Sequence, residues 1–188
     1  MDNILTNRVI AATAMVALCV ITTSPAFAEV ADSSANGFTV KISTQIQAAP
    51  ADVYARIMKV GEWWDSSHTY SQDANNLSIE ERPGGCFCEK LPNGGGVQHM
   101  EVVLLIPGKL LRMRGGLGPL QGMATAGSMT FALTAANGGT KLDVTYAVTG
   151  YSAQGLNSIA APVDHVLSEQ IARLRNSVEK GEAGTKPH

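Results

Sequence analysis

Charged side chains are scarce in this sequence, and their signs nearly cancel. Asp, Glu, Lys and Arg make up 16% of its 188 residues, and the formal net charge at pH 7 is −2. Such a balance supplies no strongly basic surface, so it gives no electrostatic case for binding nucleic acid or an anionic membrane. The function therefore has to be sought in the apolar pattern of the chain.

Several motifs of catalysis and metal binding are also absent from the sequence. No GxxxxGK[ST] segment occurs to cradle a phosphate, and the glycine-rich stretch 115–122 lacks the lysine that such a loop needs. No serine lies in a GxSxG turn, and neither CxxC nor HExxH spacing is present. These absences argue against ATP-driven and serine-hydrolase chemistry, and we expect no metal ion and no cofactor.

Long apolar runs are absent too, with one short exception near the N-terminus. Residues 9–22 are mostly apolar, but this run is shorter than the ~20 residues of a membrane-spanning helix. Arg8 precedes the run and Ala26-Phe27-Ala28 follows it, which predicts a secretory signal peptide over residues 1–28 that is cleaved after Ala28. We therefore expect a periplasmic or secreted protein of residues 29–188, with no stable membrane insertion after cleavage. An uncleaved anchor is the alternative.

The mature chain is expected to open with a strand and short helices. Residues 29–37 are small and polar, which predicts a flexible start. Apolar and polar residues alternate over 38–46, as in a half-buried strand. Pro50 suits the first turn of a helix because its missing N–H has no partner there, and we expect this helix to end at Gly61. A second short helical turn is expected at 62–65.

From residue 77 the pattern is one of strands separated by glycine- and proline-rich turns. The loop Asn137-Gly138-Gly139 is a strong hairpin signal because Asn-Gly and Gly-Gly accept positive φ at little cost. An amphipathic helix is then predicted from Pro162 to Gly181, because apolar residues recur at steps of three and four. A disordered tail is expected at 181–188.

These elements predict an α+β architecture with a hollow inside it. A curved antiparallel sheet of six to seven strands, with two short helices after the first strand, has an apolar face that only the long C-terminal helix can cover. One helix seldom fills the space beneath a wide curved sheet. The residual volume becomes a pocket between helix and sheet, where small ligands tend to bind.

Several segments resemble the SRPBCC superfamily, whose members have the helix-grip fold. They are AAPADVYARI at 48–57, Trp63-Trp64, PGGCFCE at 83–89, ANGGTKLDVTYAVTG at 136–150 and VDHVLSEQIARLRNSVE at 163–179. The superfamily includes START lipid-binding domains, birch-pollen-allergen-like proteins, polyketide cyclases and the chaperone-ATPase-activator-like group. The resemblance implies a single helix-grip domain over residues 38–180 and a cavity, rather than a shared reaction.

Candidate ligand-binding residues come from the rare aromatics and from the expected cavity walls. The chain has two tryptophans, four tyrosines and four phenylalanines, and flat rigid rings bind apolar ligands at low entropic cost. A tryptophan that only caps the core is the alternative. The glycine-rich loop 115–126 is interpreted either as a gate at the cavity mouth or as a plain connection. The expected ligand-binding residues are Trp63, Trp64, Tyr70, His99, Met123, Tyr151, Val163 and Leu167.

Candidate catalytic residues lie on one predicted strand. His99 and Glu101 are two residues apart, so their side chains share a face of that strand. If this face points inward, His99 is a candidate general base, Glu101 its partner, and Tyr70 a hydrogen-bond donor to a developing enolate. If the face points outward, both are solvated surface residues.

The two cysteines of the mature chain allow three interpretations. Cys86 and Cys88 are separated by one residue of a predicted strand, which places their Cα atoms roughly 6.5–7 Å apart, at the limit of a disulfide. Two small buried thiols are the favoured interpretation. A disulfide, and a soft metal site with His68 and His99, are the alternatives.

Three functions from different classes follow from these observations. The favoured one is a periplasmic or secreted SRPBCC-type protein that holds a small apolar or aromatic molecule in its cavity. The second is a polyketide cyclase- or dehydratase-like enzyme that uses His99 and Glu101 for proton transfer. The third is a protein-interaction role, which would need an exposed apolar patch outside the cavity.

Overall fold

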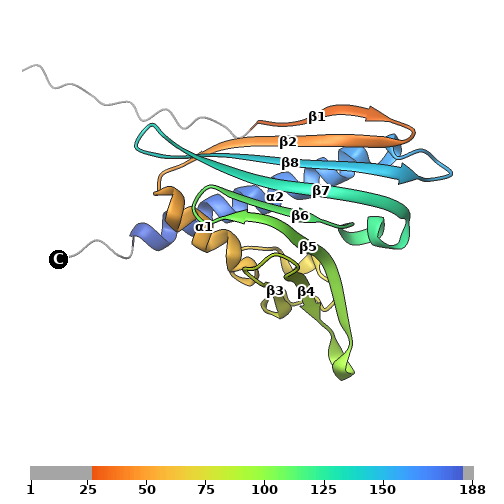
Figure 1. The fold of residues 1–188 in the computed structure, drawn as a ribbon, viewed down its shortest axis with the longest axis horizontal. Coiled ribbons are helices and arrows are strands. Elements are labelled where there is room, and N and C mark those ends of the chain that lie inside the picture. Colours follow the sequence, from red (N-terminus) through yellow and green to blue (C-terminus); the bar gives the residue numbers. More distant parts are fainter. Residues whose placement is uncertain (1–26, 184–188) are drawn as a thin grey trace, which may run out of the picture.

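The sheet of this protein contains eight antiparallel strands in the order β1-β2-β8-β7-β6-β5-β4-β3 (Figure 1). The computed structural model describes residues 27–183, so residues 1–26 of the predicted signal peptide lie outside the described chain. The strands are β1 (Phe27–Ser34), β2 (Gly37–Ile46), β3 (Leu77–Ile79), β4 (Cys86–Lys90), β5 (Gly96–Ile106), β6 (Leu110–Arg114), β7 (Ala124–Ala136) and β8 (Gly139–Tyr151). The helices are α1 (Pro50–Met58) and α2 (Asn157–Ala183). The predicted α+β helix-grip fold is confirmed.

Alternation of buried and less buried residues builds β2 and the central parts of β7 and β8. In β2 the side chains of Phe38, Val40 and Ile42 point into the core while their neighbours face outward. The β7–β8 hairpin turns at Asn137 and Gly138, which have φ of 50° and 74°, as the sequence predicts. These two strands pair along their whole length and form the centre of the sheet.

The predicted flexible start at residues 29–37 is wrong, because most of this segment belongs to β1. The backbone of β1 pairs with β2 from Phe27↔Ser43 to Ser34↔Gly37. The sequence hides this strand because an edge strand is held by backbone hydrogen bonds. Among the side chains of β1 that the structure describes, from Val30 to Ser34, Val30 is the apolar one that packs against the core. The sheet therefore has eight strands rather than six or seven.

The helical elements also differ in detail from the sequence prediction. One α-helix, α1, follows β2, and three short 3-10 turns succeed it at Val60–Glu62, Ser66–His68 and Ala74–Asn76, in place of two short helices. Helix α2 begins at Asn157, ahead of Pro162, and continues past Gly181 to Ala183. The predicted ends were wrong because proline and glycine are tolerated when tertiary packing holds the flanking turns.

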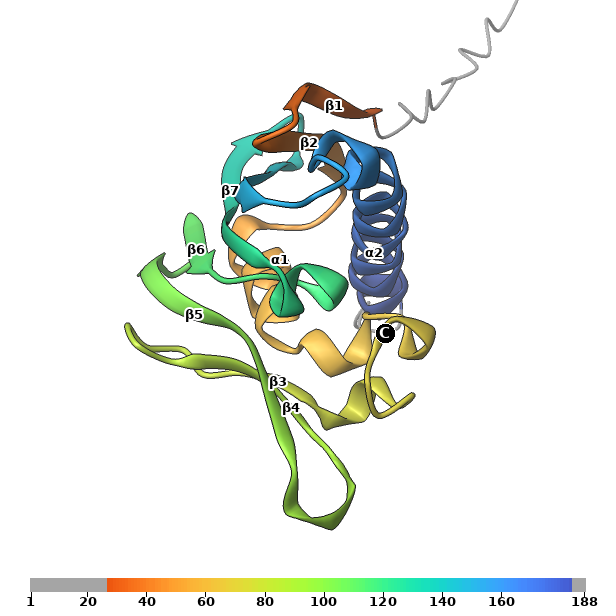
Figure 2. The ribbon, with the colours of Figure 1, turned by 90° about the vertical axis from the view of Figure 1, so that its right-hand side faces the viewer.

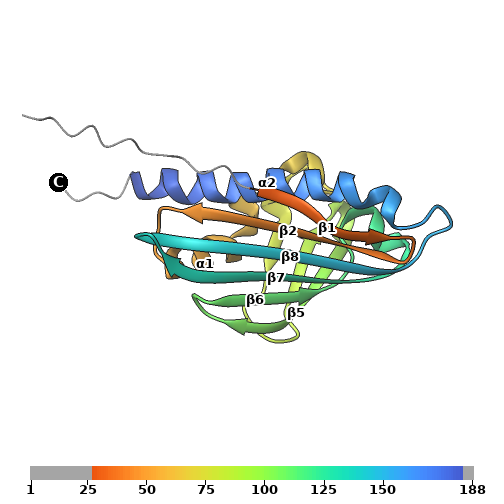
Figure 3. The same cartoon turned by 90° about the horizontal axis from the view of Figure 1, so that it is seen from above.

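Helix α2 lies along one face of the sheet (Figures 1 and 3) and packs most closely on β2 and β1. Its buried stripe includes Leu167, Ile171, Leu174 and Val178, at the three- and four-residue steps of one helix face. On the other side of the molecule the sheet curves away towards β5, β4 and β3 (Figure 2). The space under that part of the sheet is bounded by loops as well as by α2. Within residues 27–183 no helix is both long and apolar enough to cross a membrane.

We expect Leu174→Ala to lower the free energy of unfolding by about 2–5 kcal/mol, because Leu174 is fully buried between α2 and the sheet. Urea unfolding followed by circular dichroism measures the change. Asn176→Ala, at an exposed position of the same helix, is the matched control and should shift stability by less than about 0.5 kcal/mol. Similar effects of the two substitutions would contradict the packing described for α2.

Candidate functional site

A cavity of about 530 Å³ lies between α2 and the β4–β5 part of the sheet. Its wall on α2 consists of Ile159, Pro162, Val163, Val166 and Leu167. These residues follow one another at steps of three, one, three and one, so they form a continuous apolar stripe on one face of the helix. The opposite wall comes from β4, β5 and two loops, and most of the lining is apolar.

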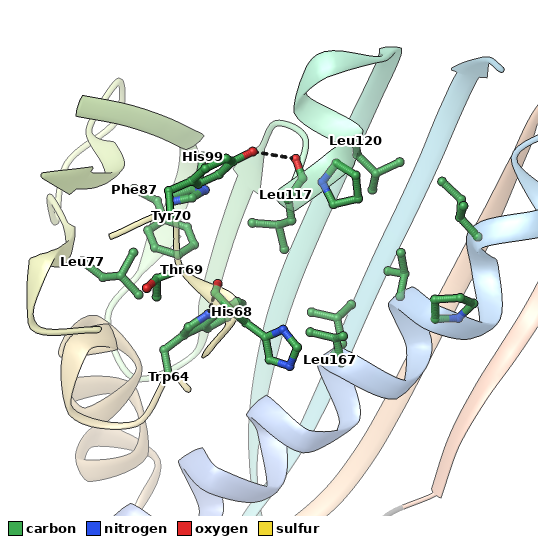
Figure 4. Close-up of a pocket in the computed structure, with 16 residues that line it drawn as sticks. Trp64, His68, Thr69, Tyr70, Leu77, Phe87, His99, Leu117, Leu120 and Leu167 are labelled. Carbon is green, nitrogen blue, oxygen red and sulfur yellow. Dashed lines mark hydrogen bonds between the residues drawn. The ribbon is translucent and has the colours of Figure 1, made fainter. Parts of the chain in front are cut away.

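The first loop that closes the cavity, residues 63–73, is tied to α2. The backbone N–H of Asp65 donates to Oε1 of Gln170, a fully buried residue of α2, at 2.7 Å. Arg173 of the same helix donates from Nε to the carbonyl oxygen of Trp63 at 3.0 Å and forms an ion pair with Asp65. Trp64, held between these contacts, donates its indole N–H to the carbonyl of His68 and turns its ring into the cavity (Figure 4).

The second loop, residues 115–123, is anchored from below by Tyr146 of β8. The Tyr146 hydroxyl accepts from the N–H of Leu117 and donates to the carbonyl of Gly115, both at 3.2 Å. Burial raises the pKa of Tyr146 to about 12, so the hydroxyl keeps its proton for the second bond. Gly127 is required beside it, because a Cβ there would lie 2.8 Å from the Tyr146 hydroxyl oxygen.

His99 and Glu89 form a buried hydrogen-bonded pair at the β4–β5 end of the cavity, where His99 contributes to the wall. His99 Nε2 lies 3.0 Å from Glu89 Oε2, and the two residues are 6% and 1% exposed. Glu89 also accepts hydrogen bonds from the backbone N–H groups of Tyr70 and Ser71. One carboxylate therefore holds both the imidazole and the middle of the first loop.

The ionisation states of the pair follow from these contacts. Burial alone would raise the pKa of Glu89. Hydrogen bonds from Ser71, Tyr70 and His99 lower the pKa by more than burial raises it, so the net shift is downward. Burial lowers the pKa of His99 below its usual value of 6.5, although Glu89 opposes this shift. At neutral pH an ionised Glu89 can only accept, so the neutral imidazole must carry its proton on Nε2.

The remaining ring nitrogen of His99 is the acceptor that this tautomer leaves free. No side chain or backbone group within residues 27–183 is hydrogen-bonded to Nδ1, and His99 contributes to the cavity wall. The imidazole lies beside the rings of Tyr70 and Phe87, with centroids 5.9 and 5.1 Å away and tilted ring planes (Figure 4). The cavity thus carries a fixed, neutral hydrogen-bond acceptor in an otherwise apolar wall.

Tyr70 joins the two loops over this end of the cavity. Its hydroxyl donates to the carbonyl of Gly118 at 3.1 Å, the dashed contact in Figure 4, and the residue is 53% exposed. A single hydrogen bond between two exposed loop groups contributes only about 0.5–1.5 kcal/mol. Tyr70 is therefore a wall of the cavity that is held across the two loops by one weak hydrogen bond.

The predicted pairing of His99 with Glu101 is wrong. A β-bulge places His99 and Met100 together opposite Phe87, since Phe87 pairs with Met100 while Cys88 pairs with Gln98. The bulge turns both His99 and Met100 inward, and it breaks the simple alternation on which the prediction depended. Glu101 pairs with Cys86 on the face away from Phe87, and it is not part of the cavity wall.

The structure brings together five of the eight predicted ligand-binding residues on the cavity wall: Trp64, Tyr70, His99, Val163 and Leu167. Three lie elsewhere. Trp63 is packed in the core and donates to the carbonyl of Arg56. Met123, the last residue of the second loop, packs against the core, and Tyr151 is 70% exposed at the end of β8.

Sequence reasoning missed Phe87 and Glu89. Their signal was present in CFCEK, where alternation puts Phe87 and Glu89 on one face of β4 and the two cysteines on the other. A glutamate on a strand is normally exposed to solvent. Its burial could not be predicted without knowing that backbone N–H groups of the first loop donate hydrogen bonds to it.

The favoured interpretation of Cys86 and Cys88 as two buried thiols is wrong, because they form a disulfide with Cα atoms 5.3 Å apart. This Cα–Cα distance is shorter than that between alternate residues of a regular strand. The cysteine pair coincides with the β4–β5 bulge. The alternative metal site with His68 and His99 loses its thiolate ligands through this bond. Among the described residues, no group of three His, Cys, Asp or Glu side chains is arranged to hold a metal ion.

We expect the free energy of unfolding to fall as the pH drops from 7 towards 5, because the unfolded chain protonates its histidine at a higher pH than folded His99 does. Glu89 affects the stability at a lower pH. Because its pKa is depressed in the folded protein, its contribution to the free energy of unfolding is complete above pH 4.5, its ordinary pKa, and is lost as the pH falls through the folded pKa. Urea unfolding at a series of pH values measures both effects.

His99→Gln should abolish the change in the free energy of unfolding between pH 7 and 5. The change at lower pH, which is assigned to Glu89, should remain. Asn176→Ala is the control, because Asn176 is exposed on α2 and carries no titratable group, so this variant should give a profile parallel to that of the unmodified protein. A His99→Gln profile that also runs parallel would contradict the neutral, buried state assigned to His99.

Comparison with known proteins gives matches among solved structures alone. No protein-family model and no curated protein matches this chain. An uncharacterised protein from Rhizobium leguminosarum aligns with a TM-score of 0.59 and 19% identity, over 84% of this chain and 99% of its own.

Two further matches connect the fold with named proteins. Ara h 8.0201 aligns with a TM-score of 0.54 and 16% identity, over 76% of this chain and 97% of its own. DynU16, a protein of the dynemicin biosynthetic locus, aligns with a TM-score of 0.54 and 19% identity, over 76% of this chain and 48% of its own. These likenesses support the helix-grip fold of this chain.

Proposed function

We propose that this protein binds a small, largely apolar molecule that carries one hydrogen-bond donor. The observation that carries the proposal is the cavity of about 530 Å³ beneath α2, whose apolar wall contains the free Nδ1 acceptor of His99. Its size falls in the ~300–1,000 Å³ range of small-molecule sites, which combine apolar walls with a few placed polar groups. Apolar surface supplies the affinity, and His99 fixes the orientation.

The proposed cellular setting is the periplasm or the exterior, in an exported member of the SRPBCC superfamily. Its support is the signal-peptide pattern of residues 1–28 and the family resemblance of the sequence, together with the helix-grip fold. A disulfide between Cys86 and Cys88 is compatible with an oxidising compartment.

A proton-transfer enzyme is the second candidate, and the His99–Glu89 pair favours it. In that mechanism Nδ1 of His99 takes a proton from a carbon acid, and Glu89 stabilises the imidazolium through Nε2–H. Glu89 thus takes the role that the sequence assigns to Glu101. Catalysed deuterium exchange into an aryl β-diketone, lost in His99→Phe, would distinguish this function from binding alone.

The protein-interaction role stays a prediction. Three apolar side chains of β5 are exposed, Val103, Leu104 and Ile106, at 39%, 39% and 46%. They lie outside the cavity wall, and they do not specify the chemistry of a partner.

We expect Val163→Trp to weaken the binding of an apolar fluorescent dye, 8-anilinonaphthalene-1-sulfonate, by at least about tenfold, because the indole would occupy the cavity beside Leu167. Fluorescence titration measures the affinity. Ala172→Trp adds the same ring at an exposed position of α2 and should leave the affinity unchanged within about twofold. Equal binding by both variants would place the dye outside the cavity.

The role of His99 is tested with two ligands that differ in one hydroxyl group, 1-naphthol and naphthalene. We expect His99→Phe to weaken naphthol about tenfold, the effect of one hydrogen bond of ~1–1.5 kcal/mol, and to leave naphthalene nearly unchanged. Isothermal titration calorimetry gives both affinities. An equal loss for the two ligands would show that the substitution disturbs the wall rather than removing an acceptor.

A further inference from the structure

The Cys86–Cys88 disulfide lies directly behind the cavity wall. The two cysteines flank Phe87, and their side chains point to the outer face of β4 while those of Phe87 and Glu89 point inward. Both cysteines are only half-buried, whereas Phe87 and Glu89 are 2% and 1% exposed. Solvent therefore reaches the sulfur side of the strand, and the ligand cavity lies on the other side.

This bridge contributes little to holding the fold together. It closes a loop of sequence separation two, and the restriction that a disulfide places on the unfolded chain grows with loop length. It joins no two elements, because both cysteines belong to β4. A long-range structural role is therefore a poor explanation for the pair.

The bridge instead constrains the backbone at the position where the site is built. The β4–β5 bulge falls at Phe87 and Cys88 and turns His99 inward. Phe87 contacts the ring of His99 at a tilt of 42° and the ring of Trp64 edge-on, with the Phe87 and Trp64 centroids 6.0 Å apart. Any change of backbone geometry between Cys86 and Cys88 moves the residue that carries both ring contacts.

We propose that the Cys86–Cys88 disulfide is a reversible redox site that exchanges with small-molecule thiols and sets the shape of the cavity wall through Phe87. The thiolate of a small thiol attacks one sulfur, which breaks the protein disulfide, forms a mixed disulfide and releases the other cysteine as a thiolate. A second small thiol attacks the mixed disulfide and leaves as the oxidised small-molecule disulfide. Two electrons and two protons pass to the cysteine pair, and the reverse reaction restores the bridge.

Reduction allows β4 to relax to the Cα spacing of a regular strand, longer than the 5.3 Å of the bridged pair. Phe87 then shifts relative to His99 and Trp64, which widens this end of the cavity. The effect on ligand binding rests on the proposed function, whereas the exchange reaction and the movement of Phe87 do not.

The test equilibrates the folded full-length protein in glutathione buffers of stepped redox ratio. Free thiols are trapped by alkylation, and peptide mass spectrometry reports Cys86 and Cys88 separately from Cys19. We expect the pair to be reduced and reoxidised with unchanged far-ultraviolet circular dichroism, and tryptophan fluorescence to follow the same redox ratio as Phe87 moves away from Trp64.

The variant Cys86→Ser/Cys88→Ser should reproduce the tryptophan fluorescence of the reduced protein. Its fluorescence should not change with the glutathione redox ratio. Affinity for 8-anilinonaphthalene-1-sulfonate should change at least threefold on reduction and be fixed at the reduced value in the variant. A bridge that is reduced only after unfolding would overturn the proposal, as would reduction that leaves fluorescence unchanged. Absence of dye binding in both states would count against the proposed function, and the redox site would then be judged on alkylation and fluorescence.

Discussion

The buried carboxylate of Glu89 is the interaction on which the site depends. It is 1% exposed and yet ionised, because the N–H groups of Tyr70 and Ser71 and the Nε2–H of His99 all donate to it. Removal of any donor would leave a buried charge less well compensated. The requirement to satisfy this charge brings the first loop to the sheet, fixes the tautomer of His99 and leaves Nδ1 as the acceptor in the cavity.

A second constraint explains why there is a cavity at all. Helix α2 packs closely on β2 and β1, at one side of a sheet that curves away from it. The loops 63–73 and 115–123 close the remaining space, and each is tied down by a buried polar residue on a regular element, Gln170 on α2 and Tyr146 on β8. Hydrogen bonds at the margins of the two loops therefore position the cavity walls, and apolar side chains line the space between them.

The sequence was informative where one local pattern decides the structure. Three patterns follow from local geometry: the alternation over 38–46, the Asn137-Gly138 turn and the helical stripe that includes Leu167. Together they predicted a curved antiparallel sheet covered by a long C-terminal helix, and the family resemblance implied the helix-grip fold. The bulge at His99 could not be predicted in this way, since it depends on how β5 pairs with β4. For the same reason the partner of His99 was assigned to Glu101, its neighbour on the strand, rather than to Glu89 across the sheet. The sequence did not predict strand β1, because backbone hydrogen bonds to β2 hold it and these bonds do not require an alternating pattern of apolar side chains.

We propose that the space between α2 and β4–β5 is a ligand site oriented by His99. A crystal structure of the protein purified from its own host tests it most directly. We expect density for a small molecule against Val163 and Leu167, with one polar atom within hydrogen-bonding distance of His99 Nδ1. A space filled instead by the protein's own side chains, with Leu117 and Leu167 packed onto Phe87, would contradict it.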